Sequence, residues 1–136
     1  MIYAVIDTNV VVSAYITKNL SAATSRVWAA VLQGRIIPVY SDEIIEEYYE
    51  VLRRKKFDIP EHLIKWAIEK VLLNGIRGER VPSKEHFPDP KDVVFYEVAL
   101  SKDDAYLVTG NKRHFPQAPI VVTPAEMLEI LQSTGL

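Results

Sequence analysis

An aspartate stands where an apolar strand ends near the start of the chain. Residues 2–6 are continuously hydrophobic and rich in β-forming side chains, and Asp7 follows them directly. This pattern predicts a strand that is covered on both faces of a parallel sheet. Open α/β sheets keep their ligand crevice at the carboxyl ends of their strands, so Asp7 is a candidate for catalysis. The alternative is that Asp7 and Asn9 only form a turn or cap the next helix.

Two further acidic residues are predicted to face the same crevice. In a helix expected over residues 42–55, Glu47 lies nearer the buried face than the other glutamates of that helix. In an apolar helix expected over residues 90–100, Asp92 falls on the same line as the packed side chains. Each has a structural alternative: Glu47 as a boundary residue with a solvated head, and Asp92 as the acid of a capping box that begins at Asp89.

Carboxylates that converge on one point repel each other unless they are protonated or bind a hard cation. The chain has no cysteine, which excludes thiolate ligands and thiol catalysis. Oxygen ligands alone favour Mg²⁺ or Mn²⁺. A site of this kind is suited to the hydrolysis of phosphodiesters, because the metal polarises the phosphate and lowers the pKa of the attacking water.

Length and charge restrict the class of protein. The 136 residues, of which 49% are hydrophobic, fit one compact domain that spans residues 1–136. A net charge of −2 argues against a protein that coats polyanions, but it allows local or metal-mediated contact with nucleic acid. The N-terminus does not resemble a signal peptide and no apolar run is long enough for a membrane span, so we expect a cytoplasmic protein without membrane contact.

Strand and helix patterns alternate along the chain. The spacing predicts strands over residues 2–6, 36–40, 106–109 and 120–122, and helices over residues 10–16, 21–34, 42–55, 60–74 and 90–100. Thr123, Pro124 and Glu126 have the pattern of a capping box that begins a last helix. This alternation predicts a three-layer α/β/α domain around a central parallel sheet of four or five strands.

Four motifs in this order resemble those of PIN-domain ribonucleases: D-T-N-V-V-V-S-A, S-D-E-I-I-E-E-Y-Y-E-V-L, D-P-K-D-V-V-F-Y-E-V-A-L and Y-L-V-T-G-N-K-R-H-F-P. The resemblance is strongest to VapC-like toxins of toxin-antitoxin pairs. It implies a PIN fold, an Mg²⁺- or Mn²⁺-dependent endoribonuclease acting on single-stranded RNA, an antitoxin partner and a homodimer. It also implies that Asp7, Glu47 and Asp92 are the catalytic, metal-binding acids, and that Asn9 orients Asp7 by hydrogen bonding.

The last motif departs from the family pattern. Many relatives have an acid where this chain has Asn111 or His114. An amide there can still hold a metal-bound water, but it weakens a second cation site. A one-metal or weakly active enzyme is therefore one of the open alternatives. His114 is either an incidental surface residue or an aid to substrate binding or proton transfer. Lys112 and Arg113 either contact the RNA backbone or belong to an ordinary exposed loop.

Two alternative functions stay open. An inactive or weakly active PIN module would bind RNA or a protein partner without cleaving, and a phosphatase would use similar metal chemistry on small phosphates.

The sequence also predicts the positions of three side chains. We expect Trp66 in the core, Tyr48 lining the groove, and Glu97 on the polar side of its helix, away from Asp92.

Overall fold

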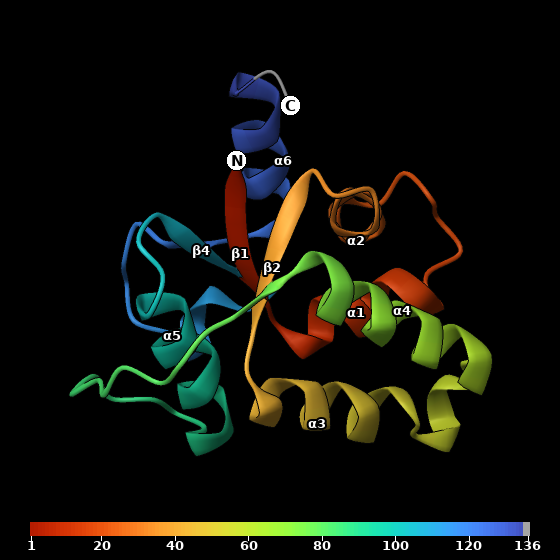
Figure 1. Cartoon of the computed structure of the whole chain (residues 1–136), viewed down its shortest axis with the longest axis horizontal. Coiled ribbons are helices and arrows are strands. Elements are labelled where there is room, and N and C mark those ends of the chain that lie inside the picture. Colours follow the sequence, from red (N-terminus) through yellow and green to blue (C-terminus); the bar gives the residue numbers. More distant parts are fainter. Residues whose placement is uncertain (135–136) are drawn as a thin grey trace.

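A parallel sheet of five strands forms the centre of the molecule, in the order β3-β2-β1-β4-β5 (Figure 1). The structure is a computed structural model, and it describes residues 1–134. The strands are β1 (Ile2–Ile6), β2 (Ile36–Tyr40), β3 (Ile76–Arg77), β4 (Ala105–Val108) and β5 (Val121–Val122). The predicted three-layer architecture with a parallel sheet is confirmed, with five strands.

Helices cover both faces of this sheet. They are α1 (Thr8–Ile16), α2 (Ala23–Leu32), α3 (Asp42–Leu52), α4 (Glu61–Asn74), α5 (Val93–Leu100) and α6 (Pro124–Ser133), with short 3₁₀ turns η1 (Lys55–Phe57), η2 (Pro90–Asp92) and η3 (Lys112–His114). Helices α2 and α4 contact β2, whereas α5 contacts β1 and β4 (Figure 1). Among residues 1–134, no helix is long and apolar enough to span a membrane.

The register of β1 and β4 brings two polar residues together. Ile6 pairs with Val108 at the end of both strands. The residues that follow, Asp7 and Thr109, are therefore neighbours across the sheet although they are far apart in sequence. The apolar strands that precede them are almost completely buried, so the sheet fixes the position of this junction through packing.

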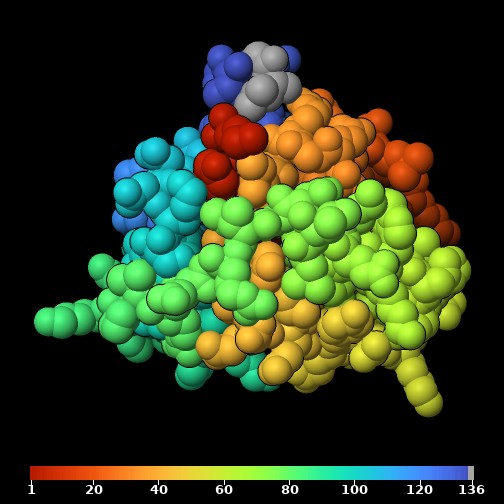
Figure 2. Space-filling view, in the orientation of Figure 1, coloured from red at the N-terminus to blue at the C-terminus, as the bar shows by residue number. Residues whose placement is uncertain are grey.

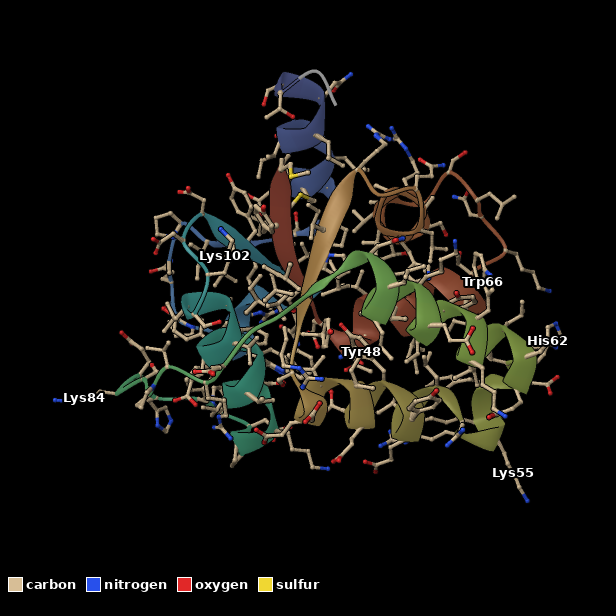
Figure 3. All side chains as sticks on the ribbon, in the orientation of Figure 1. Tyr48, Lys55, His62, Trp66, Lys84 and Lys102 are labelled. Atoms are coloured by element: carbon tan, nitrogen blue, oxygen red, sulfur yellow. The ribbon has the colours of Figure 1, made fainter. Side chains whose placement is uncertain are left out.

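Helix α3 is attached to the same junction. It begins at the N-cap Ser41, whose side chain accepts a hydrogen bond from the backbone N–H of Ile44. The Tyr48 hydroxyl donates to the carbonyl oxygen of Ile6 at 2.6 Å, and Figure 3 shows this side chain reaching from α3 toward the sheet. Tyr48 is buried, so its expected place in the groove was wrong. Its phenol satisfies the last carbonyl of β1 instead.

The structure differs from several of these expectations. The edge strand β3 was not anticipated, because Ile76 and Arg77 lie between two glycines and form no apolar run. The helix expected over residues 90–100 begins as the 3₁₀ turn η2. Trp66 is 46% exposed on α4 and lies on the outer side of the molecule (Figure 3), so its assignment to the core was wrong.

A segment without regular structure joins β3 to η2. Figure 2 shows this segment, in green, running across the front face and projecting from its left side. Two contacts hold it to the body of the molecule: Phe87 packs edge-on against Tyr96 and Phe115, and residues 80–83 bind the side chain of Glu97. The segment therefore delivers Asp92 to the sheet from a fixed direction.

Candidate functional site

Asp7 lies at the junction of β1 and α1, where its side chain is 6% exposed. Its backbone N–H donates to the carbonyl of Val108, and the Thr109 hydroxyl donates to Oδ2 at 2.8 Å. Burial raises the pKa of Asp7, and the Thr109 hydrogen bond and the backbone N–H groups of Asn9 and Thr8 oppose this shift. Asp7 occupies the N-cap position of α1, but its side chain makes no capping hydrogen bond.

Glu47 reaches the same junction from α3. Its side chain is half-buried, and its Oε2 accepts a hydrogen bond from the hydroxyl of Thr8. Burial raises the pKa of Glu47, the negative charge of Asp7 raises it further, and Lys91 opposes the shift. Glu47 thus lies close enough to Asp7 to be repelled by it, on the inner side of α3 as the sequence predicted.

Asp92 approaches from the turn η2, where its side chain is 16% exposed. Burial raises the pKa of Asp92 to about 6, and the charges of Asp7 and Asp89 contribute to this shift. Asp89, not Asp92, caps the turn, because its side chain accepts from the backbone N–H of Lys91 at 3.0 Å. Within the described part of the chain, Asp92 Oδ2 is a buried oxygen without a hydrogen-bond partner. Such an atom is costly unless a ligand satisfies it.

The three acids influence each other but are not packed into a preformed ion cage. The charges of Asp7 and Glu47 both raise the pKa of Asp92, which places all three within electrostatic reach. Among residues 1–134, however, no three acidic, histidine or cysteine side chains are close enough together to hold a metal ion as they stand. The site is therefore an open acidic junction in which mutual repulsion is not yet compensated.

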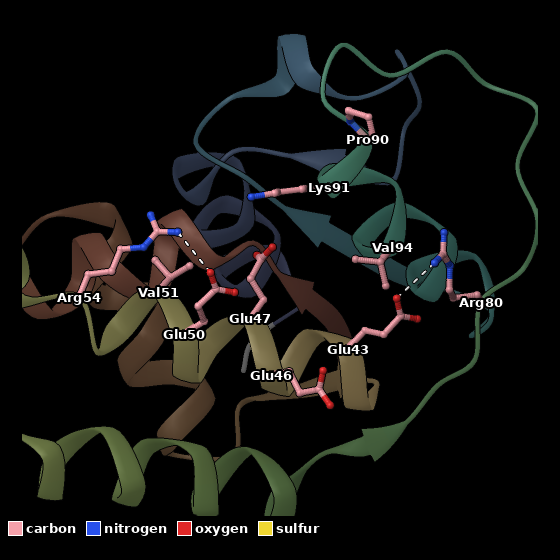
Figure 4. Close-up of a pocket in the computed structure, with 10 residues that line it drawn as sticks. All are labelled: Glu43, Glu46, Glu47, Glu50, Val51, Arg54, Arg80, Pro90, Lys91 and Val94. Atoms are coloured by element: carbon pink, nitrogen blue, oxygen red, sulfur yellow. Dashed lines mark hydrogen bonds and ion pairs between the residues drawn. The ribbon is translucent and has the colours of Figure 1, made fainter.

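A groove of about 340 Å³ opens beside Glu47, between α3 and the start of α5. Figure 4 shows that its floor carries acids of α3 and that Lys91 extends above Glu47 from the opposite side. Arg54 and Arg80 lie at its two ends, where they pair with Glu50 and Glu43. The other lining residues are Glu46, Val51, Pro90 and Val94. A groove with cations along an acidic floor can hold a phosphate chain only if the acids are neutralised.

The loop after β4 completes the site. Asn111 Nδ2 lies 3.0 Å from His114 Nε2, and His114 Nδ1 lies 3.3 Å from Asp92 Oδ2. Lys112 pairs with Glu126 at 3.1 Å, so its charge is engaged by the capping box of α6. Arg113 is exposed. Asn9 is also exposed, and it acts on Asp7 through its backbone N–H.

Sequence reasoning missed several residues of the site. The hydroxyls of Thr8 and Thr109 hold Glu47 and Asp7, and Lys91 faces Glu47 across the groove. Both threonines directly follow a strand or an acid of the motifs, which is the signal that could have identified them. Glu97 lies on the side of α5 away from Asp92, as expected, but it is 7% exposed and pairs with Arg80. Its burial was not anticipated, because the segment before η2 folds over this side of α5.

A family model described as PIN domain matches residues 3–113, which include all three acids. No curated protein matches the chain. PIN domains are typically nucleases, commonly bind RNA and generally use Mg²⁺ or Mn²⁺. The parallel sheet, the acidic junction at its carboxyl edge and the extent of the match all lead to one conclusion: the chain belongs to the PIN-domain family.

Proposed function

We propose that this PIN domain is an Mg²⁺- or Mn²⁺-dependent endoribonuclease that hydrolyses phosphodiester bonds of single-stranded RNA. The observation that carries the proposal is the buried, unsatisfied Oδ2 of Asp92, which faces an acidic junction that also contains Asp7 and Glu47. A buried carboxylate oxygen without an aligned hydrogen bond is unfavourable by itself. It becomes favourable when a cation or a substrate group supplies the missing interaction.

The donor set fits a hard divalent cation. The three acids supply only carboxylate oxygens, which are the ligands of Mg²⁺ and Mn²⁺ rather than of softer metals. Burial raises the pKa of all three acids, and the charge of Asp7 raises the pKa of Glu47 and Asp92 further. A cation would remove that repulsion. Asp7, Glu47 and Asp92 would hold the ion. When bound, it would polarise the scissile phosphate and lower the pKa of the attacking water.

The remaining polar side chains orient the carboxylates and the substrate. Thr109 holds Oδ2 of Asp7, and Thr8 holds Oε2 of Glu47, so one oxygen of each acid is fixed by a hydroxyl. Because the pKa of Asp92 is about 6, this acid is largely ionised at pH 7 and available as a ligand. No protein nucleophile is needed for this reaction.

Single-stranded RNA would enter through the groove between α3 and α5. Lys91 and Arg54 line it beside Glu47, and Arg113 is exposed on the loop after β4. Cations in these places would contact phosphates and set the position of the strand without reading its sequence. Lys112 would contribute less, because it is paired with Glu126.

The biological setting follows from the motif resemblance. We propose a cytoplasmic toxin that acts as a homodimer and is inhibited by a cognate antitoxin protein. Analytical ultracentrifugation of the purified chain would test the dimer, since a sedimentation coefficient of a monomer at micromolar concentration contradicts it. Co-expression with the protein encoded by an adjacent gene would test the antitoxin.

The activity is tested with end-labelled single-stranded RNA in Mn²⁺ or Mg²⁺, with and without EDTA. We expect cleavage by the unmodified protein, loss of cleavage in EDTA and loss of cleavage in Asp7→Asn. The matched control is Asp103→Asn, which makes the same change at an exposed carboxylate in the turn before β4. This control is expected to cleave normally.

Three results would contradict the proposal in different ways. Full cleavage by Asp7→Asn would exclude the acidic junction as the site. Retained RNA binding without cleavage would favour the alternative of an inactive RNA-binding module. Turnover of a chromogenic phosphomonoester in place of RNA would favour the phosphatase.

A further inference from the structure

The loop after β4 contains no acid, yet it joins two acids of the site through an unbroken series of contacts. The Thr109 hydroxyl donates to Asp7 Oδ2 at 2.8 Å, and the backbone N–H of Asn111 donates to the Thr109 hydroxyl at 3.1 Å. The Asn111 amide nitrogen lies 3.0 Å from His114 Nε2. His114 Nδ1 then lies 3.3 Å from Asp92 Oδ2. The series thus connects the end of β1 to the turn η2.

We propose that Asn111 and His114 are positioning residues, which hold the side chain of Asp92 in a fixed orientation relative to Asp7. This role rests on the proposed function of the acidic junction. The two residues would fix the spacing of two ligands without adding a fourth negative charge to Asp7, Glu47 and Asp92.

Both ends of the loop are anchored, which restricts the His114 ring. Thr109 is completely buried directly after β4. Phe115 is buried directly after His114 and packs edge-on against Phe87, with ring centroids 6.2 Å apart. Between these anchors, the 3₁₀ turn η3 places His114 three residues after Asn111. The two buried residues fix the backbone of the turn on both sides of His114, and this limits the positions that its partly exposed ring can take near Asp92.

Hydrogen-bond chemistry determines which ring nitrogen of His114 carries the hydrogen next to Asp92. An amide nitrogen only donates, so the neutral His114 ring must accept from Asn111 through Nε2. The single ring hydrogen is then on Nδ1, the nitrogen that faces Asp92 Oδ2. Asn111 therefore selects the tautomer that presents an N–H to the carboxylate.

The contact with Asp92 is close but incomplete. The two atoms lie 3.3 Å apart, but Asp92 Oδ2 has no properly aligned hydrogen bond. His114 can thus orient this oxygen without satisfying its hydrogen-bonding capacity, which leaves the oxygen available to a ligand. Partners of this kind typically change metal affinity or activity by about 10- to 100-fold when they are removed from a metal site.

The first test examines the ring itself and needs neither metal nor RNA. Long-range ¹H–¹⁵N NMR of the metal-free protein, above the range in which imidazole is protonated, identifies the tautomer of each of the three histidines. The spectrum of His114→Gln assigns the signal. We expect the Nδ1–H tautomer for His114, and a shift toward the Nε2–H tautomer in Asn111→Ala. An Nε2–H tautomer in the unmodified protein would overturn the proposal whatever the protein's activity.

The second test uses two substitutions that replace opposite sides of the ring. In His114→Asn the amide nitrogen takes the place of Nδ1 and can still face Asp92, whereas in His114→Gln it takes the place of Nε2 and faces Asn111. Mn²⁺ titration followed by electron paramagnetic resonance measures the metal affinity. We expect a loss of about tenfold in His114→Gln and of less than about threefold in His114→Asn. The matched control His62→Gln, on the exposed face of α4, leaves the affinity unchanged.

Kinetics separate positioning from RNA binding. A positioning residue lowers kcat, with KM for RNA nearly constant, and His114→Asn restores most of the loss that His114→Gln causes. Equal losses in both variants, or a change in KM alone, would overturn the proposal. If the unmodified protein neither binds Mn²⁺ nor cleaves RNA, the proposed function fails, and the tautomer measurement still decides whether Asn111 and His114 form the inferred pair.

Discussion

Two carboxylates on or beside α5 differ in their hydrogen-bond partners and in the direction of their pKa shifts. Glu97 accepts hydrogen bonds from the backbone N–H of Ser83 and from Arg80, each at 2.7 Å. Burial raises its pKa, but these partners outweigh burial and leave the pKa below its usual value. Asp92, five residues earlier, has an oxygen with no hydrogen bond, and its pKa is raised to about 6. Burial alone therefore does not set the pKa of an acid, because hydrogen-bond partners can outweigh it.

The difference follows from what packs against each side chain. The segment after β3 folds over α5 and delivers an N–H group and a guanidinium to Glu97. The same segment ends at Asp92, where the neighbouring charges are those of Asp7 and Asp89. One end of the segment thus forms a structural ion pair, and the other end completes an acidic junction.

The largest expected effect separates the two acids by activity. We expect Asp92→Asn to lower the rate of RNA cleavage by about 100-fold or more, about 3 kcal/mol, because a metal ligand is lost. Glu97→Gln should cleave at close to the normal rate when assayed well below its melting temperature. The measurement is the initial rate with saturating Mn²⁺. A comparable loss of rate in a fully folded Glu97→Gln protein would show that Glu97 belongs to the site.

For stability we expect the larger effect from the substitution of Glu97, not from that of Asp92. Glu97→Gln should lower the free energy of unfolding by about 2 kcal/mol, because Arg80 and the Ser83 N–H lose a charged acceptor in a buried position. Urea denaturation followed by circular dichroism measures this change. Glu79→Gln, at an exposed position two residues after β3, is the control and should be neutral. An unchanged stability in Glu97→Gln would mean that the ion pair does not fasten the segment.

The two acids should also respond oppositely to pH. The raised pKa of Asp92 means that the native state binds a proton more tightly than the unfolded chain does, so this residue lowers stability as the pH rises from about 4 to about 6. The loss should be about 1 to 2 kcal/mol, less than the full shift would give, because solvent reaches part of the side chain. Urea denaturation in EDTA between pH 4.5 and 7.5 should show this slope, and Asp92→Asn should reduce it.

Glu97 provides the internal contrast to that measurement. Its pKa is lowered, so its contribution is present above the unfolded value of about 4.3 and is lost as the pH falls below it. Glu97→Gln should therefore reduce the loss of stability in acid and leave the slope between pH 4.5 and 7.5 intact. If Glu97→Gln instead reduced the slope between pH 4.5 and 7.5, and Asp92→Asn reduced the loss of stability in acid, the partners described for these acids would be contradicted.

The smallest expected effect concerns the groove. Lys91→Gln should weaken RNA binding in a salt-dependent way, and it should reduce the slope of log K against log salt by about 0.7, as for one phosphate contact with a single strand. Lys112→Gln is the comparison, because that lysine is already paired with Glu126, and its effect should be smaller. Fluorescence anisotropy with labelled RNA at several salt concentrations measures both. If the two variants had equal slopes of log K against log salt, Lys91 would not contact the RNA backbone.

Sequence patterns predicted the elements whose signals are local. The apolar runs of β1 and β2 gave the correct strands, and the capping box at Thr123 and Glu126 gave the correct start of α6. The expected start of α3 at residue 42 was also correct. These signals are carried by neighbouring residues, so they survive in any tertiary context.

The sequence failed where a distant segment decides the environment. Glu97 lies opposite Asp92 on α5, and only the folded segment after β3 makes that side an interior one. The outward position of Trp66 on α4 depends on which of the helix's apolar side chains meet the sheet, and the buried ones are Ile64, Ala67, Ile68 and Val71. The series of contacts from Asp7 through the loop after β4 to Asp92 depends on the β1–β4 register. No single motif contains that register. Periodicity alone does not distinguish these cases.

The two edge strands have a consequence for how the protein meets other molecules. Strands β3 and β5 contain two residues each and close the sheet on both sides. So short an edge exposes too few backbone groups to template the addition of another strand, which protects the protein from edge-to-edge aggregation. Recognition by strand addition is equally disfavoured. Association must then use helical surfaces, and α4 offers one in which Trp66 is 46% exposed and Leu73 is 77% exposed.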